Sequence, residues 1–304
     1  MTLWGIYLRG ALMGAADIVP GVSGGTMAFI TGIYDRLLAA LRCLDLVALR
    51  MLLRGQWRSA WQHVDGNFLA ALLAGILTSV VTLARGISWL LAHYPVPLWA
   101  FFFGLILASA LVVLRQVAYW RPGQWLALGS GAGLAAVVAL SPTLAPVEPG
   151  LLSVFLAGFI AICAMILPGI SGSFILVLLG MYAPILGALR DLQPEVLLVF
   201  ALGAGSGLLC FSRLLHWLLR HYHALTMALL TGFLAGSLLV VWPWKRPLSW
   251  VMGSDGEPRP VQEVPVSPGA FAELGADPYL LPCLLLMVGG FLLVWWLERR
   301  WGQS

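Results

Sequence analysis

The chain is poor in charge. Only 10% of its 304 residues are charged and 61% are hydrophobic, whereas an average soluble domain is about 25% charged. Lys245 is the only lysine, so the net charge of +4 comes from arginine. Most arginines fall between long apolar runs, where they set orientation in a membrane rather than bind nucleic acid. The composition excludes an ordinary soluble fold and predicts a polytopic membrane protein.

Signatures of metal sites and enzymes are also missing. The 4 cysteines are scattered, without a CxxC pair or a histidine at ligand spacing, which argues against a disulfide framework or a metal site. No HExxH or Walker motif occurs, and the histidines after Arg213 have the wrong spacing for a lipid phosphatase. We therefore expect a protein that is not an enzyme and needs no cofactor.

The sequence repeats itself. Residues 17–42 (DIVPGVSGGTMAFITGIYDRLLAALR) align without a gap with residues 165–190 (MILPGISGSFILVLLGMYAPILGALR), at a constant offset of 148. Residues 83–94 align with 211–222 at an offset of 128, so the repeat covers most of the chain. Each copy of the first segment places a Pro-Gly turn, Pro20-Gly21 or Pro168-Gly169, inside an apolar run. Broken helices at matching positions of two halves are typical of transport sites.

The apolar runs predict the fold. Six of them are near the ~20 residues that cross a bilayer as helix: 66–91, 97–118, 124–141, 195–219, 224–243 and 279–297. The stretches on either side of Pro20 and of Pro168 are shorter, and we interpret each as a re-entrant hairpin. The prediction is an all-α polytopic membrane protein with an inverted-topology repeat, in one integral membrane domain. Repeat 1 covers residues 1–142 and repeat 2 covers 150–304, each with one hairpin and three transmembrane helices. The glycine-rich strings at 129–133 and 203–207 are interpreted as helix-packing surfaces.

Loop charges predict the orientation. Most of the arginines between the apolar runs fall on one side of this topology, which should be cytoplasmic together with both termini. Segment 43–63 mixes leucines with arginines and two tryptophans. This pattern favours an interfacial helix on anionic phospholipids, although a solvated loop is an equal alternative. The role of loop 244–278 and the oligomeric state, including a homodimer, stay open.

The two Pro-Gly turns form the candidate site. A turn at membrane depth must be buried in protein or line a cavity, because its N–H and C=O groups have no other partners. Ser23 and Ser171 are suited to cap the half-helices that follow. We expect the first N–H groups of those half-helices to be free and to bind a phosphate; they belong to Gly24, Gly25 and Thr26 and to Gly172, Ser173 and Phe174. The alternative is that both turns are helix kinks filled by packing.

Three charged residues complete the hypothesis. Arg85 and Arg213 are related by the second offset and lie inside apolar runs, where a guanidinium usually faces a cavity or a partner. Their forked donors match phosphate, and snorkelling to the lipid headgroups is the alternative. Asp17, whose counterpart is Met165, could serve as a counter-ion or in proton or ion coupling, or make a structural hydrogen bond to the turn.

The two signature segments also carry a resemblance. The strings GAADIVPGVSGGTMAFITGIYDRLL (14–38) and LPGISGSFILVLLGMY (167–182) resemble a bacterial membrane family once catalogued as a domain of unknown function. That family is now associated with undecaprenyl phosphate translocation, in the PopT group. The resemblance implies recycling of the C55 lipid carrier phosphate from the outer to the inner leaflet of the cytoplasmic membrane for cell-envelope synthesis. It places the family motifs on Asp17, Pro20, Gly21, Ser23, Gly24, Gly25, Thr26, Pro168, Gly169, Ser171, Gly172 and Ser173.

The leading hypothesis is thus a flippase for polyprenyl phosphate. The headgroup would pass through a midplane cavity while the prenyl tail stays in lipid, with one repeat rocking against the other. A channel or exchanger for a small inorganic anion is the first alternative, because half-helix N-termini suit such ions equally well. An enzyme that cleaves a lipid phosphate is the second.

Overall fold

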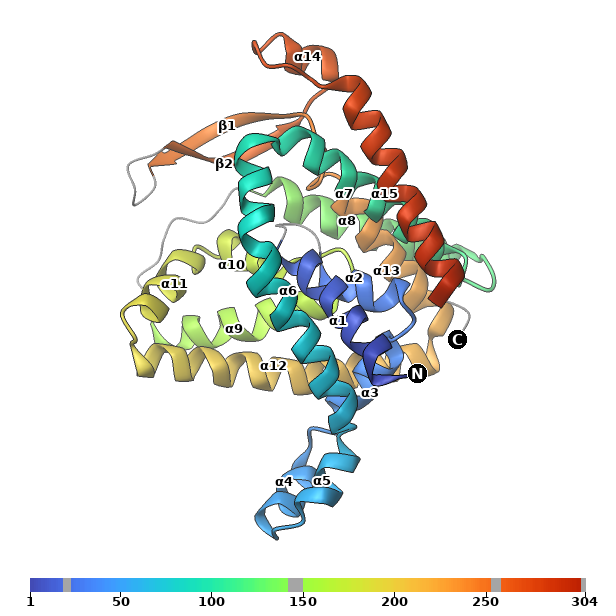
Figure 1. Ribbon diagram of the computed structural model, residues 1–304, viewed down its shortest axis with the longest axis vertical. Coiled ribbons are helices and arrows are strands. Elements are labelled where there is room, and N and C mark those ends of the chain that lie inside the picture. The colour runs from blue at the N-terminus through green and yellow to red at the C-terminus, as the bar shows by residue number, and fades with distance from the viewer. Residues whose placement is uncertain (19–22, 142–149, 253–257, 302–304) are drawn as a thin grey trace.

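The computed structural model describes residues 1–18, 23–141, 150–252 and 258–301, so Pro20 and Gly21 lie outside the described part. The protein is mostly helical (Figure 1). Its first half contains α1 (Leu3–Asp17), α2 (Gly24–Ile30), α3 (Tyr34–Arg42), α6 (Gly66–His93), α7 (Pro95–Leu114) and α8 (Pro122–Leu140). The second half contains α9 (Leu151–Ile166), α10 (Gly172–Leu178), α11 (Tyr182–Arg190), α12 (Pro194–His221), α13 (His223–Ser237) and α15 (Leu280–Trp301).

The order and lengths of these helices match between the two halves. The short helices α2 and α10 both have 7 residues, α3 and α11 both have 9, and α6 and α12 both have 28. Each short helix is followed by a glycine in the left-handed region, Gly32 at φ 71° and Gly180 at φ 67°. Because glycine lacks a Cβ, it makes this sharp turn without strain.

Most of the expected membrane spans are confirmed. Helices α6, α7, α8, α12 and α15 each hold a stretch long and apolar enough to cross a membrane. The expected sixth span at 224–243 is wrong in its length, because α13 ends at Ser237 after 15 residues. At 1.5 Å per residue such a helix covers only about 22 Å, and Pro243 and Pro247 follow soon after. The pair α10 and α11, bent by 108°, counts as one further span only if taken together.

Glycines bring helices of the two halves into close contact. Gly104 of α7 lies against the carbonyl of Met287 in α15, and Gly232 of α13 lies against that of Leu128 in α8. An added Cβ at either position would overlap the facing main chain. The close pairs are therefore α7 with α15 and α8 with α13, and the two halves are interleaved around one apolar core. The expected packing role of 129–133 is confirmed at Gly131, which faces Leu229 of α13; Gly203 and Gly207 face α9 in the same way.

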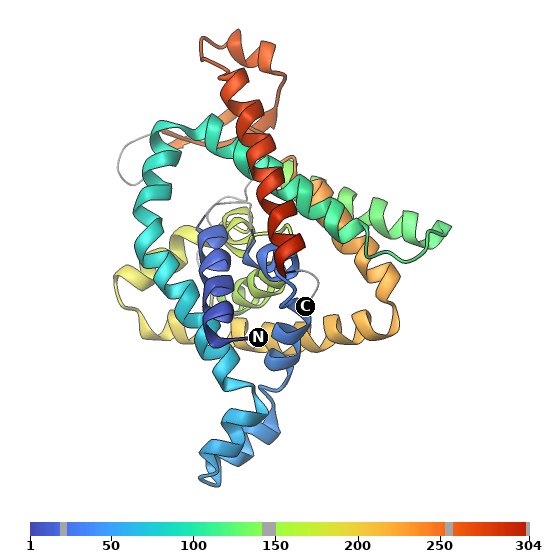
Figure 2. The same ribbon diagram turned by 45° about the vertical axis from the view of Figure 1, so that its right-hand side comes forward.

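Two extra segments lie at opposite ends of the molecule (Figures 1 and 2). At one end, α4 (Leu46–Leu53) and α5 (Trp57–His63) form a projecting arm with exposed leucines and tryptophans. Segment 43–63 is thus helical, as two short helices separated by Gly55 at φ 71°. At the other end, β1 (Lys245–Met252) pairs antiparallel with β2 (Pro258–Pro265), followed by α14 (Pro268–Ala272). The loop 244–278 therefore adds a small sheet to the expected all-α fold.

Replacing Gly232 with alanine should destabilise the α8–α13 contact by roughly 1–3 kcal/mol, because the new methyl group overpacks a main-chain contact. Gly133→Ala is the matched control, since no atom lies within 4 Å of the Cβ position there. Thermal unfolding of the detergent-solubilised protein, followed by tryptophan fluorescence, measures both. Equal melting temperatures for the two variants would contradict the close approach of α13 to α8.

Candidate functional site

The two broken segments meet in the interior of the protein. The hydroxyl of Ser23 donates to the carbonyl of Met165 at 3.2 Å, and the N–H of Gly169 donates to Oγ1 of Thr26 at 3.1 Å. The hydroxyl of Tyr34 donates to the carbonyl of Ile166 at 2.9 Å. Segments about 140 positions apart in sequence thus supply each other's hydrogen-bond partners. We call this region the junction.

In the first copy, the N–H groups that we expected to be free are used within the segment. Gly24 N–H donates to Oδ1 of Asp17 at 2.7 Å, and Gly25 N–H donates to Oγ of Ser23 at 3.1 Å. Thr26 N–H donates to the carbonyl of Ser23 at 3.0 Å. The capping role expected of Ser23 is confirmed, but the expectation of free donors is wrong for this copy. The reason is that the Asp17 carboxylate already occupies the position that a bound anion would take.

The second copy differs. Met165 replaces Asp17, and the hydroxyl of Ser171 lies 2.8 Å from that of Ser173 instead of capping its own helix. Within the described residues, the N–H groups of Gly172, Ser173 and Phe174 have no acceptor. Ser171 is buried and Ser173 is exposed. The second copy therefore keeps the open set of N–H donors that was predicted for both.

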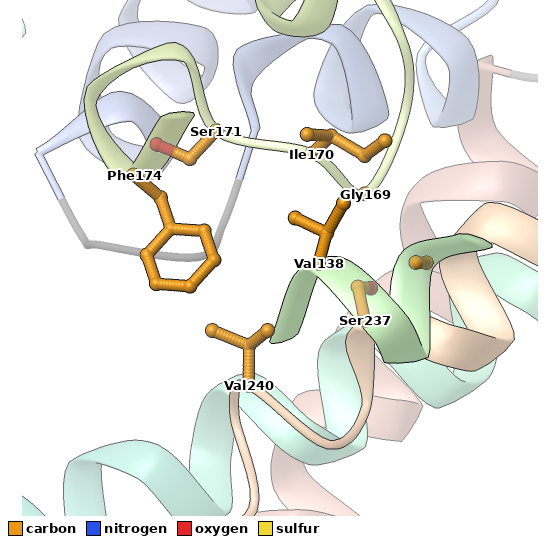
Figure 3. A pocket seen from close by; sticks show the side chains of 8 residues that line it. Val138, Gly169, Ile170, Ser171, Phe174, Ser237 and Val240 are labelled. Carbon is orange, nitrogen blue, oxygen red and sulfur yellow. The ribbon is translucent and has the colours of Figure 1, made fainter. Parts of the chain in front are cut away.

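A small pocket lies beside the second copy, between the turn at 169–171, α8 and the end of α13 (Figure 3). The side chains of Phe174, Val138 and Val240 surround it, and the hydroxyl of Ser171 lies on the same side as Phe174. Its volume is about 10 Å³, near the lower limit for a single water molecule. The pocket is too small for a phosphate in this conformation.

Sequence comparison now identifies the family. Residues 13–258 match the family model described as VCA0040-like, undecaprenyl phosphate translocase-like. This chain belongs to that family. A polyprenyl-phosphate transporter of Vibrio cholerae serotype O1 is 48% identical over 295 residues, covering 96% of this chain and 95% of the relative. A polyprenyl-phosphate transporter of Staphylococcus aureus is 30% identical over 268 residues, covering 79% of this chain and 86% of the relative. No solved structure matches.

Membership in the translocase-like family confirms the resemblance of the two signature segments. The matched family and both relatives are transporters, and this chain has several helices able to cross a membrane. It is therefore a multi-pass membrane transporter rather than an enzyme. In this family member, the junction joins the two signature segments, 14–38 and 167–182.

The paired arginines lie away from the junction contacts. Arg85 and Arg213 are both exposed, on α6 and α12. The Arg213 guanidinium donates to the carbonyl of Leu209, one turn back on its own helix, at 2.9 Å. Within the described part of the chain, no hydrogen bond joins either arginine to Ser23 or Ser171. Their role in binding phosphate stays a prediction, and it concerns the approach to the site rather than the junction itself.

Two residues of the core were missed as functional candidates. Arg9 is only 5% exposed, and its Nε donates to the carbonyl of Thr31 at 3.1 Å, tying α1 to the end of α2. Tyr34 is 3% exposed and reaches across to the second segment. The sequence signals were an arginine inside the first apolar run and a tyrosine repeated as Tyr182. Neither signal reveals which main-chain carbonyl the side chain will reach.

Replacing Thr26 with valine should destabilise the protein by about 1–3 kcal/mol, because the buried N–H of Gly169 loses its acceptor while the side-chain shape is kept. Thr82→Val is the matched control, since Thr82 is exposed and its hydroxyl donates only to its own helix at 2.7 Å. Thermal unfolding in nanodiscs gives the comparison. A Thr26 variant as stable as the Thr82 variant would mean that the junction bond contributes nothing.

Proposed function

We propose that this protein translocates undecaprenyl phosphate, the C55 lipid carrier, from the outer to the inner leaflet of the bacterial cytoplasmic membrane. The relatives named polyprenyl-phosphate transporters support this substrate class. The observation that carries the proposal is the junction, where the N–H groups of Gly172, Ser173 and Phe174 lie beside a polar break with no acceptor among the described residues. Such groups at membrane depth suit a phosphate headgroup, while the prenyl tail remains in lipid.

We further propose that the two halves are inserted with opposite topologies. The matched helix lengths support a structural repeat, and three crossings after each hairpin would invert the second half. The third crossing of the second half then requires the 15-residue α13 to span a locally thinned bilayer. Helices α6 and α12, with 28 residues each, are about 42 Å long and cross the ~30 Å hydrocarbon core when tilted. The arginine-rich arm lies at one end and the sheet at the other (Figures 1 and 2). The arm end is then cytoplasmic, with both termini, and its apolar side chains rest on anionic phospholipids.

Differences between the copies support alternating access. Tyr34 is 3% exposed, whereas its counterpart Tyr182 is 43% exposed. Helix α3 packs against α12, but the corresponding pair α11 and α6 is at most in marginal contact within the described residues. One side of the junction is therefore closed by packing and the other is not. An exchange of these two arrangements would open the opposite side.

Asp17 has a place in this cycle. Its carboxylate holds the N–H of Gly24, so an arriving phosphate must compete with it for the first copy. A proton or another cation that neutralises Asp17 would release this donor to the substrate. The resting counter-ion and the coupling residue are then the same group.

Replacing both Arg85 and Arg213 with alanine should reduce transport of farnesyl phosphate into proteoliposomes to background, because both mouths lose the fork that attracts the headgroup. Arg246→Ala, an exposed arginine in β1, is the control with unchanged transport. Undiminished transport by the double variant would show that the two arginines take no part in the mechanism. Uptake of inorganic phosphate or chloride in place of the lipid would favour the small-anion channel.

Asp17→Asn should abolish the response of transport to a proton gradient, since the amide keeps the shape of the carboxyl group but cannot exchange a proton. The measurement compares farnesyl phosphate transport with and without an imposed gradient. Asp191→Asn, in the exposed turn after α11, is the control and should retain the wild-type response. An Asp17 variant that still responds to the gradient would leave only the structural hydrogen bond to Gly24.

A further inference from the structure

A second polar hollow lies away from the junction, at the end of the molecule that carries the arm. It is bounded by α3, the end of α12 and the start of α13, and its volume is about 410 Å³. The lining includes Asp35, Arg36, His216, Arg220 and His223. An adjoining hollow of about 270 Å³ shares Arg220 and His223 and adds His221. We call the larger of the two the basic pocket.

The cationic side chains of the basic pocket differ in whether they already have a partner within the protein. Arg36 is held by two hydrogen bonds to Asp65, at 2.7 and 3.1 Å, and its guanidinium lies over the ring of Phe68 at 4.5 Å. Its charge is therefore neutralised, and its position is fixed. By contrast, within the described part of the chain Arg220 has neither an ion pair nor a hydrogen bond from its side chain. The Arg220 fork remains available to a ligand.

One histidine points to a missing acceptor or donor. The Nε2 atom of His216 is buried and has no hydrogen-bond partner among the described residues. Buried polar atoms are nearly always satisfied, so one that is not calls for an explanation; His216 itself lines the basic pocket. His216 also lies within electrostatic range of Arg42 and Arg220, so a group bound there lies in a positive field. No cluster of three metal-ligating side chains occurs among the described residues, and the donor set instead suits an anion.

The internal repeat provides a comparison. The positions that correspond to the polar lining at the other mouth are Ser88, Ala92, Pro95, Ala183 and Pro184. None of them carries a charge. The charged and imidazole side chains of the basic pocket therefore have no charged counterparts at the repeat-related positions.

We propose that the basic pocket binds a phosphate monoester, with the Arg220 fork and the imidazole of His223 as donors and His216 in the pocket wall. Its place in the cycle depends on the proposed function: it receives the headgroup at the cytoplasmic mouth. Asp35 repels a phosphate dianion but accepts a hydrogen bond from a singly protonated phosphate. Sulfate has no such proton at neutral pH and should bind less well.

The test is calorimetric titration of the full chain in nanodiscs with farnesyl phosphate, inorganic phosphate and sulfate. Arg220→Gln should weaken farnesyl phosphate binding about tenfold, because it removes charge-assisted hydrogen bonds. His223→Gln should weaken it less, and Arg246→Gln, at the opposite end of the molecule, should not change it. Equal weakening for inorganic phosphate would mean that free phosphate also binds, whereas an effect on the lipid alone would restrict the pocket to headgroups. Both results support the pocket.

Wild-type affinity in both the Arg220 and His223 variants, with unchanged thermal unfolding, would overturn the inference. Lipid transport in proteoliposomes separates this failure from that of the proposed function. Wild-type protein that binds phosphate through Arg220 but moves no lipid would keep the pocket and remove the translocase. Normal lipid transport by an Arg220 variant that binds phosphate with wild-type affinity would rule out the pocket and keep the translocase.

Discussion

A break in the main chain inside an apolar core must find partners for its N–H and C=O groups, and the remaining architecture depends on how this protein meets that demand. Here the two breaks serve each other. Ser23 donates to a carbonyl at the second break, and Thr26 accepts from Gly169. A change in either segment therefore alters the hydrogen bonds of the other. This mutual dependence couples the two halves at the point where the proposed substrate passes.

Interleaving restricts how the halves can move. Helices α7 and α15, one from each half, touch through Gly104 and Gly290, and α8 and α13 touch through Gly131 and Gly232. Such close main-chain contacts resist separation, because closely packed interiors leave little room for rearrangement. Helices α1 with α6 and α9 with α12 are packed just as closely, through Gly75 and Gly203, but within one half. Each of these pairs, which carry the broken segments, is therefore expected to move as one unit relative to the four interleaved helices.

The sequence alone was sufficient for the repeat, the breaks and most of the spans, because each depends on local pattern and length. It was not sufficient for the pairing of α7 with α15, since a glycine in an apolar helix does not specify which helix it faces. The sequence also led to a wrong expectation at Gly24, whose N–H was expected to be free. The two copies differ here, with Asp17 in the first and Met165 in the second. Only the fold places Oδ1 of Asp17 at 2.7 Å from the main-chain nitrogen of Gly24. The arm became two helices because Gly55 interrupts it.

The difference between Asp17 and Met165 also has an electrostatic consequence for the junction. Burying a lone charge at membrane depth costs at least a few kcal/mol, so an empty site that is strongly attractive to a phosphate is itself expensive. In the first copy Asp17 already supplies the negative charge that the N–H groups favour, and in the second copy these groups remain without an acceptor among the described residues. A phosphate that replaces the carboxylate changes the local charge far less than one entering an empty site. If the carboxylate is protonated at that moment, one anion substitutes for another, and the headgroup can cross the core without a large electrostatic barrier.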